Sequence, residues 1–259
     1  METITIEKPE TETIKETASD SVAVIVLLVN NPAFKVEKPY AIKLLGKAMS
    51  DWVIMAAEGH NPKTVEYNMD EDILLSIRPH LTDAKYTVVL FSDAPLLKAK
   101  TLSEIIDYAR LKKVGVVKLT RGYVFETEFV KSAETLYSAQ PHYFDEEDFM
   151  TAYNYKQLTF IESILKTRIL SFHMKRGVRI LEPDSTMIDA EVTIEEGTVI
   201  HGGNRLYDTC YIGKNVKLLP NNYIKNSIID DNSKVLYSVI ENSKIPPNSN
   251  IGPFEKIIH

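Results

Sequence analysis

Two short stretches of the sequence carry side chains that could act on phosphate groups. In "VVLFSDAPLL", Asp93 directly follows an apolar run that is typical of a buried strand. A carboxylate at the carboxyl end of such a strand is well placed to hold Mg²⁺ against phosphate oxygens. An aspartate just before Pro95 is also common as a capping or turn residue, so both interpretations of Asp93 stand.

The second stretch is "VIVLLVNNPAFKVEKPY", in which an apolar strand pattern is followed by a loop without glycine. Lys35 and Lys38 in this loop could neutralise phosphate charge, or they could be ordinary surface lysines. Nucleotide phosphates usually dock just past such a strand, where small residues let backbone N–H groups approach them. The missing glycine is therefore the first question that this sequence raises.

Composition excludes several classes of partner. The chain has 259 residues, 44% of them hydrophobic, which suits one or two globular domains. Its 30 Lys and Arg against 36 Asp and Glu leave no basic excess for a nucleic acid backbone. The single cysteine, Cys210, cannot form an internal disulfide, and the apolar run 22–29 is too short to span a membrane. We expect a cytoplasmic protein with neither nucleic acid nor membrane as a partner.

The elements that would position these residues alternate between strand and helix. The runs "VAVIVLLV", "YTVVLF", "VGVVKL" and "GYVFE" predict strands. Between them, "SDWVIMAAEG" predicts a helix that is capped by Ser50 and ended by Gly59, and "TLSEIIDYARLKK" predicts one that Thr101 and Glu104 open as a capping box. Such alternation favours an α/β domain with a parallel-rich sheet. The preceding residues 1–20 lack a stable apolar face and predict a flexible tail.

A long helix is predicted after this domain. It is drawn by apolar residues spaced by three and four, and Gly177 closes it. The stripe consists of Leu158, Ile161, Leu165, Ile169 and Phe172. A basic cluster on the same segment is typical of a solvated helix face. That cluster consists of Lys166, Arg168, Lys175, Arg176 and Arg179.

After Gly177 an aliphatic residue recurs at every sixth position. The series is Ile188, Ile194, Ile200, Leu206, Ile212, Leu218 and Ile224, and it continues to Ile251 with steps of five or six. A hexapeptide period indicates a left-handed parallel β-helix of triangular section, in which one aliphatic per short strand points inward. We therefore divide the chain into a tail at 1–20, an α/β domain at 21–152, a linker helix at 153–179 and a β-helix at 180–259.

With these elements in place, four stretches resemble one known family. They are "VIVLLVN", "KPYAIKLLGKAMSDWVI", "VVLFSDAPLL" and the long segment from "YKQLTFIESILKTRIL" to "EEGTVIHGG". Together they resemble the bacterial bifunctional N-acetylglucosamine-1-phosphate uridyltransferases and glucosamine-1-phosphate acetyltransferases, the GlmU family. The resemblance covers most of residues 22 to 254. It implies a shortened Rossmann-like nucleotidyltransferase domain followed by a hexapeptide-repeat β-helix. Because a β-helix this short buries little apolar surface within one chain, we expect residues 180–254 to form a homotrimer.

The resemblance also shows where the sequence departs from the family. The family signature Leu-Ala-Ala-Gly-x-Gly-Thr-Arg-Met wraps the triphosphate, whereas this chain has "LLVNNPAFK", with Asn30 in place of the first glycine. Tyr40 stands where the family has a lysine after Pro39. Asp93 matches the family's metal aspartate. The second metal ligand, an asparagine, aligns with Tyr153, and Asn154 is its neighbour. Mg²⁺ at Asp93 and Asn154 is therefore the possible cofactor that the resemblance implies.

Two further differences concern the family's two activities. Only 28 residues separate Asp93 from Gly122, where the family has a much longer segment that builds the sugar and uracil pocket. The family's acetyltransferase residues lie in coils after the segment that corresponds to "GPFEKIIH", so we expect no acetyltransferase activity. His201 and Cys210 could be a base and a nucleophile, but a corner histidine and a buried thiol are the more ordinary interpretations.

Two hypotheses of function follow from this sequence. In the first, the chain is a degenerate relative of the uridyltransferase that acts as an oligomeric binding or scaffolding protein, with a nucleotide or sugar nucleotide as its possible ligand. In the second, it is an active sugar-phosphate nucleotidyltransferase with a remodelled Mg²⁺-dependent site, in which Lys35, Lys38 and Asp93 would take part.

Overall fold

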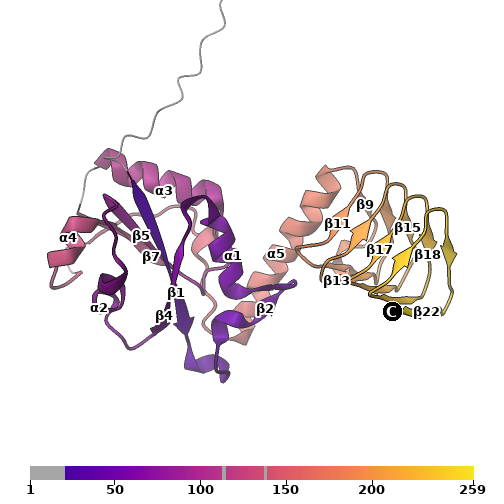
Figure 1. Ribbon diagram of the computed structural model, residues 1–259, viewed down its shortest axis with the longest axis horizontal. Coiled ribbons are helices and arrows are strands. Elements are labelled where there is room, and N and C mark those ends of the chain that lie inside the picture. Colours follow the sequence, from indigo (N-terminus) through magenta and orange to yellow (C-terminus); the bar gives the residue numbers. More distant parts are fainter. Residues whose placement is uncertain (1–20, 113–114, 137–138) are drawn as a thin grey trace, which may run out of the picture.

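The structure of the chain, a computed structural model, describes residues 21–112, 115–136 and 139–259. The tail predicted at 1–20 lies outside these residues. An α/β domain and a β-helix lie at the two ends of one long helix, α5 (Tyr155–Lys175) (Figure 1). This arrangement confirms the fold class that the sequence predicts.

The N-terminal domain is built on a six-stranded mixed sheet. Its order is β4 (Lys63–Asn68), β1 (Val22–Asn30), β5 (Tyr86–Phe91), β7 (Gly122–Glu126), β6 (Val116–Leu119) and β8 (Gln140–Pro141). β1 pairs in parallel with both β4 and β5, whereas β7 runs antiparallel to β5 and β6. Every residue of β5 is buried, as expected for a strand that is covered on both faces. The carboxyl ends of β1 and β5 therefore meet at one edge of the sheet.

Helices cover both faces of this sheet. They are α1 (Met49–Ala56), α2 (Ile73–Ile77), α3 (Ala99–Lys112) and α4 (Thr127–Ser132). Alternate side chains of β1 point to opposite faces. Val24 and Val26 pack with side chains of α1 and α3, whereas Ile25 and Leu27 pack with side chains of α2 and α4. Short 3₁₀ helices complete the domain: η2 (Pro32–Phe34), η3 (Pro39–Ala41), η4 (Glu58–His60), η5 (Arg78–His80) and η6 (Glu147–Phe149).

Two predicted helix starts are wrong. α1 begins at Met49 after Ala48, which has no capping side chain, and Ser50 lies inside the helix. α3 begins at Ala99, so Thr101 is not its cap. The hydroxyl of Thr101 instead donates to Asp148 Oδ2 at 2.5 Å. In α3, a tertiary contact thus uses the hydroxyl that the predicted capping box needs.

Two elements escaped the sequence prediction. Strand β4, with the sequence KTVEYN, is mostly polar, lies at the edge of the sheet and has a weak strand signal. The hairpin β2–β3 (Lys43–Leu44, Lys47–Ala48) has strands of only two residues. The tip of this hairpin touches the start of the β-helix, since the carbonyl of Leu45 accepts a hydrogen bond from the backbone N–H of Ala190 at 3.0 Å.

The apolar stripe of α5 shifts along the helix. Leu158, Ile161 and Leu165 are buried against the N-terminal domain. Phe172, which the spacing places on the same stripe, is 55% exposed, and Leu170 and His173 are buried instead. The stripe rotates because the last turns of α5 pack against the β-helix core and not against the N-terminal domain.

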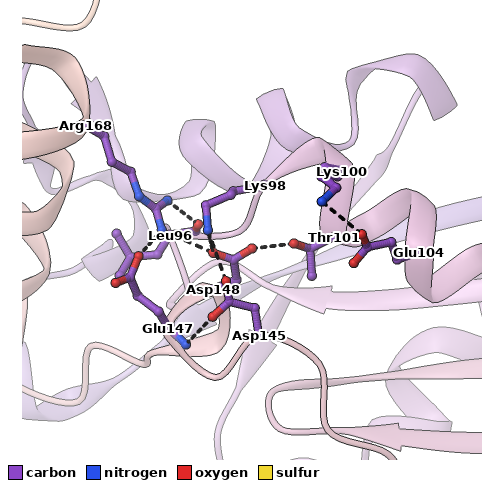
Figure 2. Close-up of polar contacts among 9 residues, drawn as sticks. All are labelled: Leu96, Lys98, Lys100, Thr101, Glu104, Asp145, Glu147, Asp148 and Arg168. Carbon is purple, nitrogen blue, oxygen red and sulfur yellow. Dashed lines mark hydrogen bonds and ion pairs between the residues drawn. The ribbon is translucent and has the colours of Figure 1, made fainter. Parts of the chain in front are cut away.

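The basic cluster on α5 is not simply a solvated face. Arg168 donates to the carbonyl of Leu96 at 2.6 Å and to the carboxylate of Asp148 at 3.1 Å. Asp148 is fully buried and also accepts from Lys98 Nζ at 2.5 Å. Figure 2 shows Lys98, Thr101 of α3 and Arg168 of α5 converging on Asp148 of η6. The network fastens α5 to the N-terminal domain.

The β-helix consists of strands of two or three residues stacked in three parallel sheets. The strands are β9 (Arg179–Ile180), β10 (Met187–Ile188), β11 (Thr193–Ile194), β12 (Val199–Ile200), β13 (Arg205–Tyr207), β14 (Tyr211–Ile212), β15 (Lys217–Leu218), β16 (Tyr223–Lys225), β17 (Ile228–Ile229), β18 (Lys234–Val235), β19 (Val239–Glu241), β20 (Lys244–Ile245), β21 (Asn250–Ile251) and β22 (Lys256–Ile258). A further 3₁₀ helix, η7 (Pro183–Ser185), lies between β9 and β10. The sheet orders are β10-β13-β16-β19-β22, β11-β14-β17-β20 and β21-β18-β15-β12-β9.

The hexapeptide pattern is confirmed in its register. Ile188, Leu206 and Ile224 lie opposite one another on successive strands, and all three are fully buried. The corners between strands use residues that tolerate a left-handed backbone. Asn215, Asn221, Asn226, Asn232, Asn242 and Asn248 all have positive φ.

Candidate functional site

The loop that follows β1 closes on itself. Pro32 has no backbone N–H, and the next three residues use theirs within the loop. Ala33 N donates to Asn31 Oδ1 at 3.0 Å, Phe34 N to Asn31 O at 3.3 Å, and Lys35 N to Pro32 O at 3.1 Å. The backbone donors that a glycine-rich loop would offer to a phosphate are therefore already occupied. This closure answers the question that the missing glycine raises.

The same loop is attached to the start of α5. Phe34 is 1% exposed, and its ring meets the ring of Tyr155 edge to face, with centroids 5.1 Å apart. Tyr155 Oη donates to the carbonyl of Phe34 at 3.1 Å, and Asn31 Nδ2 donates to the carbonyl of Tyr153 at 3.1 Å. Because Phe34 and Asn31 are buried, opening the loop would expose the Phe34 ring and break two hydrogen bonds.

A cavity of about 550 Å³ remains beside this loop, between the ends of β1 and β4. Among the described residues that line it, Asp70 and Glu71 carry charge, and both are acidic. Asn30 Oδ1 is buried and has no hydrogen-bond partner in the described part of the chain. An unpaired acceptor and two carboxylates cannot donate to phosphate oxygens. The cavity is therefore poorly suited to a triphosphate.

The lysines of the loop do not line this cavity. Lys35 and Lys38 are both exposed. Tyr40, at the position where a lysine was expected by resemblance, is 8% exposed and donates from Oη to Glu66 Oε1 at 2.8 Å. Burial, together with this hydrogen bond and the nearby charge of Glu66, raises the pKa of Tyr40. Tyr40 thus ties η3 to β4 and brings no positive charge.

Asp93 lies at the carboxyl end of β5, where the sequence places it, and it is 1% exposed. Both of its carboxylate oxygens accept hydrogen bonds from Arg121, Oδ1 from Nε at 2.9 Å and Oδ2 from Nη2 at 2.6 Å. Burial raises the pKa of the Asp93 carboxyl, and the two bonds from Arg121 act in the opposite direction. A buried carboxylate paired in this way is a fixed ion pair.

The second predicted ligand position, Asn154, lies at the start of α5. Asn154 is exposed and caps α5, its Oδ1 accepting from Gln157 N at 3.1 Å. Tyr153 N donates to the Gln157 side chain at 3.0 Å. No group of three or more His, Cys, Asp or Glu side chains that could hold a metal ion occurs within residues 21–112, 115–136 and 139–259. Metal binding by Asp93 and Asn154 remains a prediction.

The two weaker candidates lie in the β-helix. His201 is half-buried at the corner between β12 and β13. Cys210 is 1% exposed, and its thiol donates to the carbonyl of Tyr207 at 3.2 Å. Burial raises the pKa of the Cys210 thiol, which makes the thiolate scarce at neutral pH. Neither residue is brought next to Asp93 or to the loop after β1.

Sequence reasoning missed Arg121 and Tyr155. Arg121 stands in "RGYVFE", in the turn before β7, and its partner Asp93 is 28 residues away. One signal for Arg121 was present in the sequence, since it stands beside a glycine at the start of a predicted strand. That strand, β7, pairs with β5, the strand before Asp93. Tyr155 carries no comparable signal, because its contact with Phe34 spans 121 residues.

Comparison with known proteins gives three kinds of result. No family model matches the chain. The bifunctional protein GlmU of Caldanaerobacter subterraneus is 43% identical over 101 residues, which are 39% of this chain and 22% of that protein. GlmU of Brevibacillus brevis is 24% identical over 281 residues, which are 78% of this chain and 61% of that protein.

This chain is related to the GlmU proteins. It spans about a fifth of the length of the first of these relatives and less than two thirds of the second. Among solved structures, the GlmU-related chain resembles CMP:2-keto-3-deoxy-manno-octonic acid synthetase complexed with CTP, with a TM-score of 0.46, 8% identity, and coverage of 57% of this chain and 99% of that one. A TM-score this low supports no statement about activity.

Proposed function

We propose that this chain is a UDP-N-acetylglucosamine pyrophosphorylase-related protein that has lost the full uridyltransferase reaction and acts as an oligomeric binding or scaffolding protein. One observation carries the proposal. A nucleotidyltransferase holds its triphosphate at the loop after β1. In this chain the backbone N–H groups of residues 33–35 are hydrogen-bonded to acceptors within that loop. The relation to GlmU makes the uridyltransferase the reaction to compare with.

The loop after β1 offers fewer free backbone donors and less positive charge than a triphosphate needs. Phosphoryl and nucleotidyl transfer depend on positioning and on stabilising the charge that develops on the phosphates. Removing a single preorganised donor costs about 10²–10³ in rate. In this chain three backbone donors are occupied at once, Tyr40 replaces a lysine, and Asp70 and Glu71 face the cavity. These losses need not add, but together they oppose binding of a triphosphate.

The direct test is calorimetry of the full chain with UTP, the other nucleoside triphosphates and UDP-N-acetylglucosamine, each with and without Mg²⁺. An active GlmU protein serves as the positive control. We expect no UTP binding below millimolar concentration. Robust Mg²⁺-dependent release of pyrophosphate that is lost in Asp93→Ala would instead establish the second hypothesis, an active sugar-phosphate nucleotidyltransferase.

The oligomeric part of the proposal rests on the β-helix. Tyr211 and Ile228 lie next to each other on the outer face of the sheet that contains β14 and β17, and they are 37% and 39% exposed. Flat apolar faces of this kind commonly pack against copies of themselves in closed rings. We propose a homotrimer. Light scattering at micromolar concentration should give three times the chain mass, and Ile228→Glu should lower it. A monomer would contradict the trimer.

The proposal also includes a place in the cell. None of the helices in the described part of the chain has the length and apolar character that are needed to cross a bilayer. We propose that the protein works in the cytoplasm. Fractionation of cells with an antibody against the full chain tests this, and recovery with the membrane pellet after a high-salt wash would oppose it.

A further inference from the structure

Arg121 is held beside Asp93 by the backbone. Strand β7 runs antiparallel to β5, and Gly122 lies opposite Leu90 near the end of β5. Gly122 has φ +151°, and a Cβ at this position would lie 2.7 Å from the carbonyl oxygen of Val89. Only glycine therefore allows the turn between β6 and β7 to approach β5 this closely. That approach places the preceding residue, Arg121, next to Asp93.

The guanidinium is enclosed as well as paired. Its central carbon lies 4.1 Å from the centroid of the Phe91 ring and 5.9 Å from that of Tyr153. The Arg121 side chain is 18% exposed, against 1% for Asp93. Aromatic faces attract a guanidinium, and a two-bond contact with a carboxylate fixes its orientation. Arg121 is thus a built part of the site and not a surface side chain that folds over it.

These residues do not fit a divalent ion. Mg²⁺ demands near-octahedral oxygen ligands at about 2.0–2.1 Å and retains several waters. Both oxygens of Asp93 are already occupied by Arg121, and the phenyl ring of Phe91 lies on the guanidinium. A second positive charge would also be repelled by Arg121 at a distance where little water screens it.

We propose that Arg121 is the resident cation of this site and takes the place of a divalent metal ion. The positive charge that balances Asp93 is then part of the chain. Two consequences follow: the unmodified protein does not bind a divalent ion at Asp93, and binding of any ligand to this edge of the sheet is independent of Mg²⁺. This inference concerns the charge of the site and does not depend on the proposed function.

The first test is a titration of the full chain with Mn²⁺ alone, followed by electron paramagnetic resonance of the free ion. We expect the unmodified chain and Asp93→Asn to bind the same amount of Mn²⁺ up to about 1 mM. A class of sites that is present in the unmodified chain and absent from Asp93→Asn would overturn the proposal. Because the titration contains no nucleotide, this outcome is separate from nucleotide binding, which would overturn only the proposed function.

The second test is a double-mutant cycle on thermal unfolding, which shows whether the two residues act as one unit. Arg121→Met alone leaves a buried carboxylate without a partner and should lower the melting temperature by about 5–10 °C. In the Asp93→Asn background the same substitution should shift it by less than about half as much. Lys38→Met, which removes an exposed charge, is the matched control. Equal shifts in both backgrounds would show that Arg121 does not serve Asp93, and the proposal would fail.

Discussion

The guanidinium of Arg168 on α5 lies 3.1 Å from the buried carboxylate of Asp148, which belongs to the short helix η6 just before α5. The same carboxylate accepts from Thr101 of α3 and from Lys98. One side chain with no exposed surface thus joins η6 and the start of α3 to the long helix (Figure 2). A buried charge of this kind is tolerated only when it is paired and hydrogen-bonded.

Removing this carboxylate should loosen the N-terminal domain. In Asp148→Ala, three donors lose their acceptor, and we expect the free energy of unfolding to fall by about 3 kcal/mol. Arg168→Met should cost less, about 1 kcal/mol, because Lys98 and Thr101 still pair with Asp148. Urea unfolding followed by the fluorescence of Trp52 measures both. Lys156→Met, an exposed lysine on α5, is the control. A change below 0.5 kcal/mol (about one pairing energy) in Asp148→Ala would contradict this account.

His173 should make stability depend on pH. Its side chain is 3% exposed, and Nδ1 has no hydrogen-bond partner in the described part of the chain. Burial, with a smaller effect of Arg176, lowers the pKa of His173 from 6.5 to about 4. The unfolded chain therefore binds a proton between these pH values that the folded chain refuses. The contribution of neutral His173 to the free energy of unfolding is fully present above about pH 6.5 and is lost as the pH falls towards 4.

The measurement compares urea unfolding at pH 7.5 and pH 5.0. The unmodified chain should lose about 2 kcal/mol from this one group over that interval. His173→Leu keeps the site apolar and should remove this part of the pH dependence while leaving the contribution of other groups. The same loss in both proteins would show that His173 is not responsible.

Creating a cavity in the core of the β-helix should lower the free energy of unfolding. Leu218 is fully buried on β15, and its neighbour Lys217 points outward. Leu218→Ala should lower the free energy of unfolding by about 2–5 kcal/mol, because the stacked coils cannot collapse around the lost volume. Lys217→Ala on the same strand should change it by less than about 0.5 kcal/mol. If the two variants melt together in calorimetry, the inward and outward assignment is wrong.

Gly46 at the tip of the β2–β3 hairpin and Gly59 in η4 form a matched pair of glycines. Gly46 has φ +85°, and a Cβ there would lie 2.9 Å from Asp189 Oδ2 at the start of the β-helix. Gly59 has nothing within 4 Å of such a Cβ. Gly46→Ala should destabilise by about 1–3 kcal/mol through backbone strain and the close contact, whereas Gly59→Ala should be close to neutral. Thermal unfolding distinguishes them, and a harmless Gly46→Ala would refute the close packing of the hairpin.

The sequence predicts the β-helix well because its signal is local. An inward-pointing aliphatic residue recurs about every six residues along the β-helix. The register of Ile188, Leu206 and Ile224 can therefore be predicted from this segment alone. The strands β1 and β5 are equally clear, since their apolar runs are continuous. Strand β4 is not, because an edge strand needs no such run to be stable.

The sequence predicts what the candidate site lacks but not which contacts it contains. The missing glycines indicate that a phosphate loop is absent, but they do not show what replaces it. The replacement depends on contacts between distant residues, such as Phe34 with Tyr155 and Asp93 with Arg121. Those pairs form because the sheet and α5 bring the ends of several elements together. A spacing pattern carries no information about which distant side chains will meet there.

The attachment of α5 at both of its ends has a mechanical consequence. Tyr155 at its first turn is fastened to the loop after β1, and Leu170 near its last turn is embedded in the β-helix core. A helix of this length, 21 residues, is about 30 Å long and stiff along its axis. A force applied to the β-helix is therefore transmitted along α5 to the loop that follows β1.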